Sequence, residues 1–279
     1  MMEITVLIEN QGPETLACEH GLALHIDYKG HSILLDTGSS GAFADNAKQL
    51  GIDLAQVELA VLSHGHYDHA DGMRAFFREN DRAAMYVRKG ALGAYYSMRG
   101  GAPKFVGIHR DICRDYAPRL VEVEGVYPLM PGVWLVENPA PEANPERAQH
   151  LHEKVGEDQF VEDRFAHEHS LVLEGENGLV VFNSCCHAGG ANIAAHIANT
   201  FPGRPIAALL GGFHMMGATG TDSINCSEDY VCALADTLTR LGVQQVYTGH
   251  CTGEPAFRLL EERLGGRLHD MKTGSRIRL

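Results

Sequence analysis

Short apolar segments that end at turn-forming residues recur along the first third of the chain. Runs at 4–10, 22–28 and 31–38 are bounded by Gly, Asn and Asp, which is typical of strands, and Tyr28-Lys29-Gly30-His31 suits a hairpin turn. The pattern at 42–50 predicts a helix that Gly51 would end. The next predicted elements are a strand at 58–63, a helix at 72–80 and a strand at 83–89.

The second half of the chain repeats this rhythm. Two apolar runs around Glu176-Asn177-Gly178 predict a hairpin of strands at 170–175 and 178–184. The other predicted strands lie at 119–124, 133–137, 206–212, 244–249 and 276–279, and the helices at 190–199, 227–241 and 255–264. Because both halves alternate strands with helices, we expect two sheets covered by helices rather than an open dinucleotide-binding sheet.

Two stretches interrupt the pattern. Residues 90–117 contain Gly100-Gly101 and Pro103, and residues 138–167 contain Pro139, Pro141 and Pro145. Loops of this length inside a compact domain usually have a function. The prediction is therefore one domain over 1–279, with an inserted lobe at about 90–117 and a long irregular segment at about 138–167.

Charge and composition disfavour some classes of function and indicate one kind of site. A net charge of −13 disfavours nucleic acid as a partner, and the chain lacks the apolar run of about 18 residues that a membrane span needs. No signal peptide is visible, and the seven cysteines do not form a disulfide framework, so we expect a cytoplasmic protein. The sixteen histidines stand out, because histidine is the commonest metal ligand.

Four ligand-type residues follow the strand predicted at 58–63: His64, His66, Asp68 and His69. Alternation beyond a strand points His64 and His66 the same way, whereas residues two apart do not share a helix face. Asp68 and His69 come one turn later and can face a neighbouring point. The cluster can therefore serve two metal ions about 3.5–4 Å apart, and a mononuclear site that uses part of it is the alternative.

Three more histidines follow later apolar strands. His187, His214 and His250 stand after the strands predicted at 178–184, 206–212 and 244–249. Functional groups of α/β proteins gather at strand ends, which makes His187 and His250 candidate ligands. His214 follows Gly211-Gly212 and is either a functional residue or a structural histidine.

These motifs resemble the metallo-β-lactamase superfamily. LLDTG (34–38) followed by SHGHYDHADG (63–72) is similar to its first two motifs, and CCHAGGAN (185–192), GGFH (211–214) and TGHCTG (248–253) are similar to later ones. The later motifs resemble the subfamily of dihydropterin ribofuranosyl-aminobenzene phosphate synthases. The resemblance extends over about 3–279 and implies an α/β (α+β) fold, a four-layer αββα sandwich.

The resemblance also implies a ligand set. One metal would be held by His64, His66 and His187, and the second by Asp68, His69 and His250. Asp36 of LLDTG would orient the histidine cluster, as carboxylates commonly do for ligating imidazoles. Most superfamily hydrolases carry a bridging Asp at a later strand end. In this chain the corresponding strand end carries Gly212-Phe213-His214. His214 would therefore replace that Asp, or a water alone would bridge the two metals, or the second metal would bind weakly.

The expected activity is hydrolysis. Two divalent metal ions, zinc first and iron or manganese next, would activate water to attack an ester, lactone or phosphoester of a small molecule. Asp68 would orient that water or accept its proton, with His214 as the second candidate catalytic residue. The resemblance makes a pterin-related phosphate compound one candidate substrate.

Substrate contacts and two other functions stay open. Lys89, Tyr95, Lys104 and His167 lie in or beside the irregular stretches and could hold an anionic or ring-bearing substrate, or belong to solvated loops. Cys185, Cys186 and Cys251 flank the expected ligands, so an iron-containing redox protein is one alternative. A metal- or ligand-binding module without catalysis is the other.

Overall fold

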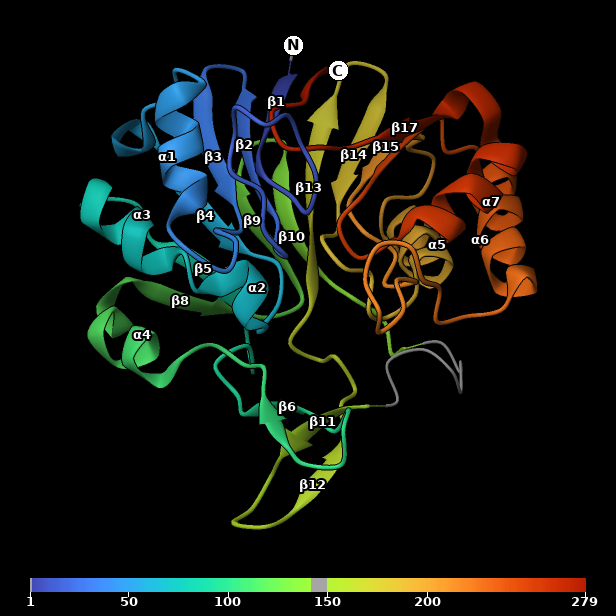
Figure 1. Cartoon of the computed structure of the whole chain (residues 1–279). Coiled ribbons are helices and arrows are strands. Elements are labelled where there is room, and N and C mark those ends of the chain that lie inside the picture. Colours follow the sequence, from blue (N-terminus) through green and yellow to red (C-terminus); the bar gives the residue numbers. More distant parts are fainter. Residues whose placement is uncertain (1, 142–149) are drawn as a thin grey trace. The chain divides into compact units, whose positions relative to one another are not determined.

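The computed structural model describes residues 2–141 and 150–279, and its contacts divide the chain into two compact units. Unit 1 comprises Met1–Glu124, His150–Glu168 and Lys272–Leu279. Unit 2 comprises Gly125–Gln149 and His169–Met271. Each unit carries its own seven-stranded sheet (Figure 1). The expectation of a single domain over 1–279 stays a prediction.

The sheet of unit 1 has the strand order β18-β1-β2-β3-β4-β5-β8. The pairs from β18 to β3 are antiparallel, and those from β3 to β8 are parallel. The predicted hairpin is confirmed, because Tyr28 pairs with His31 and both Lys29 and Gly30 have positive φ. The strands are β1 (Met2–Ile8), β2 (Ala23–Tyr28), β3 (His31–Leu35), β4 (Leu59–Leu62), β5 (Met85–Arg88), β8 (Leu120–Val123) and β18 (Arg276–Arg278).

Helices α1 (Ala42–Gln49) and α3 (Met73–Glu79) cover one face of this sheet (Figure 1). They bury Phe43 and Phe76 in one cluster with Leu34 and Leu62 of the strands. Gly51 follows the end of α1 with φ +78°, as a helix-ending glycine should. The short elements of this part are η1 (Leu54–Gln56), α2 (Tyr67–Ala70), α4 (Arg110–Asp115) and η2 (Ala117–Arg119).

A second, four-stranded sheet in unit 1 has the order β12-β11-β6-β7. It is built from β6 (Tyr95–Ser97), β7 (Lys104–Phe105), β11 (Leu151–Lys154) and β12 (Phe160–Glu162). The stretches expected to be a lobe and an irregular segment therefore contribute strands to one small sheet. Within the segment expected to be irregular at about 138–167, Leu151–Lys154 and Phe160–Glu162 are strands that pair with each other. Residues 142–149 of that segment lie outside the described residues.

The sheet of unit 2, like the large sheet of unit 1, has an antiparallel part and a parallel part. It has the order β17-β16-β15-β14-β13-β10-β9, antiparallel from β9 to β14 and parallel from β14 to β17. The strands are β9 (Val126–Met130), β10 (Val133–Glu137), β13 (His169–Gly175), β14 (Gly178–Phe182), β15 (Ile206–Leu210), β16 (Gln245–Thr248) and β17 (Leu268–Asp270).

Helices α5 (Gly190–Thr200), α6 (Glu228–Arg240) and α7 (Glu254–Leu264) pack on the sheet of unit 2, and η3 (Gly265–Arg267) follows α7. Ile193, Leu234 and Leu260 of the three helices share one buried cluster with Val181 and Leu209 of the strands. The chain is thus a mixed α/β protein, as expected. Among the described residues, no helix is long and apolar enough to cross a membrane.

Candidate metal centre

The predicted histidine cluster directly follows the buried strand β4. We call residues 63–69 the histidine loop. The rings of His66 and His69 lie 4.7 and 4.3 Å from that of His64, centroid to centroid, and all three side chains are buried. Strands β3 and β4 are parallel, so the segments that leave their carboxyl ends meet at one edge. Asp36 is thereby placed beside the loop.

Asp36 is fully buried and accepts three hydrogen bonds from the histidine loop. Its Oδ1 accepts from the backbone N–H of Ser63 at 2.7 Å. Its Oδ2 accepts from Ser63 Oγ at 2.7 Å and from Nδ1 of His69 at 2.8 Å. The backbone of Asp36 has φ +60°, a conformation that Asp tolerates better than most residues. This carboxylate therefore fixes both the backbone and a ring of the loop.

The same network settles the proton positions of two imidazoles. Ser63 Oγ gives its proton to Asp36, so it accepts from Nδ1 of His64, which lies 2.9 Å away. His69 likewise gives its Nδ1 proton to Asp36. Each ring therefore carries its proton on Nδ1, and in the neutral state its lone pair lies on Nε2, the form in which imidazole binds metals. The donor set of the loop thus fits a divalent metal.

His66 and Asp68 complete the loop. Burial lowers the pKa of His66 to about 3, so its ring is neutral near pH 7. Oδ2 of Asp68 lies 3.5 Å from Nε2 of His69 and 3.3 Å from Nε2 of His20. His20 was not predicted here, because a lone histidine before β2 belongs to no motif.

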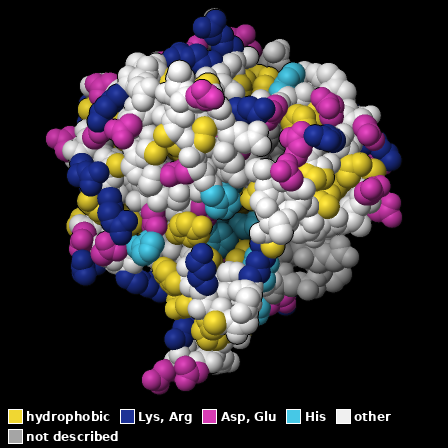
Figure 2. All heavy atoms as spheres, in the orientation of Figure 1, with side chains coloured by type: hydrophobic (Ala, Val, Ile, Leu, Met, Phe, Trp, Pro, Cys, Tyr) yellow, Lys and Arg dark blue, Asp and Glu magenta, His cyan; other side chains and the backbone are white. Residues whose placement is uncertain are grey.

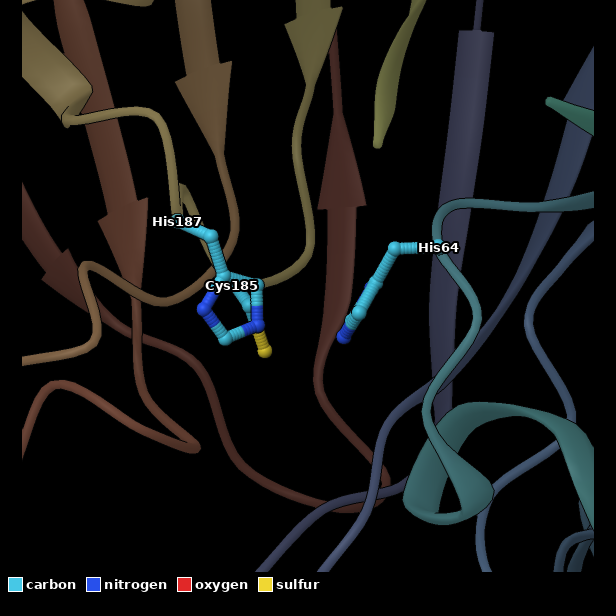
Figure 3. A group of neighbouring side chains, drawn as sticks. All are labelled: His64, Cys185 and His187. Carbon is cyan, nitrogen blue, oxygen red and sulfur yellow. The ribbon is translucent and has the colours of Figure 1, made fainter. Parts of the chain in front are cut away.

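In unit 2 the three expected histidines follow parallel neighbouring strands. His187, His214 and His250 come after β14, β15 and β16, so their segments leave the same edge of the sheet. The rings of His187 and His214 lie 4.2 Å apart between centroids. His187 and His250 are buried, whereas His214 is half-buried. Figure 3 shows His187 and Cys185 on the segment after β14, and His64 on the segment after β4.

Two cysteines of unit 2 lie beside His214. The ligand atoms of Cys185, His214 and Cys251 lie within 4.8 Å of one another. The Sγ of Cys251 accepts the backbone N–H of His214 at 3.2 Å. A side chain on Gly212 would overlap this sulfur, which explains the second glycine of GGFH. These residues could hold a soft metal ion.

The four residues expected to bind substrate lie in different surroundings. Lys89 and Lys104 are exposed, and Nζ of Lys89 pairs with Glu124 at 2.6 Å. Tyr95 and His167 are buried, 3 and 1% exposed. Nothing in the sequence pointed to Ser63 or Asp163 as partners of the loop, although Ser63 stands directly before His64.

Comparison with known proteins agrees with this architecture. Residues 18–182, more than half of the chain, match the model of the metallo-β-lactamase superfamily, so the chain belongs to that superfamily. A solved structure of Tm1679, a metal-dependent hydrolase of the β-lactamase superfamily, is similar with a TM-score of 0.83 and 28% identity, covering 100% of this chain and 99% of that one.

Two further relatives are more distant. The 7,8-dihydropterin-6-methyl-4-(β-D-ribofuranosyl)-aminobenzene-5'-phosphate synthase of Methanocaldococcus jannaschii is 23% identical over 275 residues, covering 93% of this chain and 90% of that one. Zn²⁺-bound PqqB from Methylobacterium extorquens shares the fold, with a TM-score of 0.58, 12% identity and coverage of 99 and 100%. The superfamily is generally enzymatic and typically binds divalent metals.

Proposed function

We propose that the chain is a metal-dependent hydrolase of small, anionic molecules. The observation that carries the proposal is the network of Asp36, Ser63, His64 and His69. It keeps the Nδ1 protons of two imidazoles in buried hydrogen bonds, so that each ring, when neutral, presents its lone pair on Nε2. Desolvating a carboxylate and two histidines is costly, and a metal ion would compensate for that cost.

The proposed ligand set retains the expected assignment. His64, His66 and His187 would hold one metal, and Asp68, His69 and His250 the second. The orientation of His64 and His69 supports the part of this set in unit 1. His187 and His250 are included on the strength of their motifs. Imidazole and carboxylate ligands suit zinc first, and iron or manganese next.

The chain's own residues would handle the proton and the substrate. A divalent metal, when bound, activates water for attack on a carbonyl or phosphorus centre. Asp68 would accept the proton of that water, and its neighbour His20 could relay the proton to solvent because it is half exposed. His214 stands where most superfamily hydrolases carry a bridging Asp, so it is the second candidate catalytic residue.

The substrate class follows from charge and resemblance. Lys and Arg side chains are interspersed with Asp and Glu on the face drawn in Figure 2, and the net charge is −13, so a small molecule is a better substrate than a nucleic acid. The similarity to the pterin-phosphate synthase supports a phosphate compound of a pterin-like ring as one candidate.

Metal content and turnover test this proposal together. Protein purified without chelators should contain divalent metal, and His64→Ala should contain less. The metal-loaded protein should hydrolyse at least one compound in a panel of aryl esters, lactones and phosphoesters, including a phosphorylated dihydropterin. Asp68→Asn should lower kcat by about 10²- to 10⁴-fold. His31→Ala is the matched control, because this half-exposed histidine pairs with Glu58. Metal without turnover would indicate a binding module instead.

One observation favours a second function. Cys185, His214 and Cys251 of unit 2 bring two sulfurs and an imidazole nitrogen within 4.8 Å, a donor set that iron also accepts. An iron-containing redox protein would be coloured as isolated and give an electron paramagnetic resonance signal that Cys251→Ala changes. A colourless protein that contains zinc would exclude this alternative.

A further inference from the structure

Residues 91–107, which include strands β6 and β7 of the small sheet, lie against Gly65, the residue between two expected ligands. The backbone N–H of Tyr67 donates to Val106 O at 3.0 Å, and His66 forms an antiparallel bridge with Gly107. A Cβ on Gly65 would overlap the carbonyl oxygen of Ala91. Residues 91–107 thus pack directly against the histidine loop, and only glycine fits between them.

Residues 163–167 also contact Gly65. They directly follow strand β12 of the small sheet. Nδ1 of His167 accepts the backbone N–H of Gly65 at 3.0 Å. The proton of this ring therefore sits on Nε2, which donates to Oδ2 of Asp163 at 3.1 Å. Asp163 and His167 are 3 and 1% exposed, so water does not compete for these bonds.

Asp163 and His167 are themselves held rigidly. Oδ1 of Asp163 accepts the backbone N–H of Phe165 at 2.7 Å, and the backbone N–H of Asp163 donates to Leu151 O at 3.0 Å. The ring of Tyr95 lies 3.9 Å from that of His167 between centroids. The hydroxyl of Tyr95 donates to Gly90 O at 2.7 Å, and burial raises its pKa, which keeps it protonated.

From these contacts we infer that His167, oriented by Asp163, is a positioning residue for the histidine loop. The inference rests on the proposed function and deepens it. The amide that His167 holds belongs to the peptide between His64 and Gly65, so this hydrogen bond restrains the backbone that positions His64 and, one residue further on, His66. His167 therefore restrains the loop at the amide of Gly65, as Asp36 restrains it at the amide of Ser63.

The rival explanation is a metal site of its own. Ligand atoms of His66, Asp163 and His167 lie within 4.8 Å of one another. However, one ring nitrogen of His167 accepts from Gly65 and the other donates to Asp163. A metal ion would have to break one of these two buried hydrogen bonds. The geometry therefore favours positioning over ligation.

Two substitutions of His167 separate the roles. His167→Leu removes the acceptor for the Gly65 amide, whereas the side-chain oxygen of His167→Asn can take the place of Nδ1. With zinc alone as the probe, we expect His167→Leu to lower affinity roughly 10- to 100-fold and His167→Asn to restore most of the loss. The absorption spectrum of the cobalt(II) form should shift in the Leu variant and return in the Asn variant. In metal-free protein, exchange of the Gly65 amide hydrogen should be faster in the Leu variant.

A buried polar side chain elsewhere in unit 1 provides the control. Nδ2 of Asn80 donates to Leu54 O and Val57 O, so Asn80→Leu should destabilise the unit with the zinc affinity unchanged. Equal zinc affinities for wild type and His167→Leu would overturn the inference, as would the loss of one metal equivalent in both His167 variants. If the wild type bound no zinc, the proposed function would fail. Exchange of the Gly65 amide would then still decide whether His167 holds the loop.

Discussion

Asp36 shows how one buried carboxylate can define a metal-binding loop. It accepts from two atoms of Ser63 and from His69, and it has no exposed surface. In Asp36→Asn one oxygen becomes an NH₂ group that faces donors instead of accepting from them. We expect a loss of about 1–3 kcal/mol in the free energy of unfolding of metal-free protein, because a buried donor is left unpaired. Urea unfolding in the presence of chelator measures it.

Zinc affinity is the second property that Asp36→Asn should change. Asp36→Asn should also weaken zinc binding, because His64 and His69 lose the group that fixes their proton positions. Asn46→Asp offers a comparison at another buried polar site of unit 1, one that contacts Leu7 and Ala17. Unchanged stability and zinc affinity in Asp36→Asn would contradict the role assigned to this network.

His25 on β2 predicts a pH dependence that does not involve the proposed metal ligands. Burial lowers the pKa of His25 in the folded protein, so the unfolded chain takes up the proton first as pH falls. The stability linked to His25 is complete above pH about 6.5 and is lost below it, by at most about 1.4 kcal/mol per pH unit.

His25→Gln isolates this contribution. Glutamine does not titrate and can keep the hydrogen bond that Nε2 of His25 forms with Ser32 Oγ at 2.9 Å. Urea unfolding of both chelated proteins at pH 7.5 and 5.5 should show a smaller loss for the variant. Equal losses in the two proteins would show that His25 titrates alike when folded and unfolded.

At the level of the element, the connection from β4 to α2 depends on Gly65. A Cβ there would overlap Ala91 O, so Gly65→Ala must displace either the loop or residues 91–95. We expect a loss of about 1–3 kcal/mol in unfolding free energy, together with weaker zinc binding. Gly266→Ala is the control, because a Cβ at Gly266 would meet no atom within 4 Å. A Gly65→Ala protein as stable as this control would mean that the loop adapts.

Several residues that follow strands in the sequence motifs have a positive φ angle. Asp36, Cys186, His214 and His250 have positive φ although they are not glycine. Each stands in a motif that the sequence already singles out, because tight exits from strands need such residues and place side chains at the sheet edge. The partners Ser63 and Asp163 were not predicted. The contact of Ser63 with Asp36 depends on the register of β3 against β4. Asp163 acts through His167, which lies about 100 positions after Gly65 in the chain.

The small sheet was also beyond sequence reasoning. Strands β11 (LHEK) and β12 (FVE) are short and polar, and they lack the apolar alternation that predicts a strand. Strand β9 contains Pro128 and lies at a sheet edge, where proline is tolerated although it disfavours a strand prediction. Apolar elements such as β14 and α5 were predicted correctly, because their buried positions carry apolar residues in a recognisable order along the sequence.

At the scale of the whole molecule, the last residues of the chain belong to the first unit. Strand β18 pairs with β1 at the edge of its sheet, with Ile277 opposite Ile4. Just before it, Oγ1 of the buried Thr273 accepts the backbone N–H of Glu9 at 2.8 Å and lies 3.2 Å from Glu9 O. Unit 1 is therefore completed only when the chain returns from unit 2.

This closure predicts that unit 1 is sensitive to changes at the end of the chain. Thr273→Val should cost about 1–3 kcal/mol of unfolding free energy, because it deprives a buried N–H of its partner, and Thr273→Ser should restore most of the loss. Deletion of 272–279 should cost more and should promote association, because it leaves the outer edge of β1 without its partner strand β18. Urea unfolding and size-exclusion chromatography measure the two effects. A truncated protein with the stability and elution volume of the full chain would show that the return of the chain contributes nothing to unit 1.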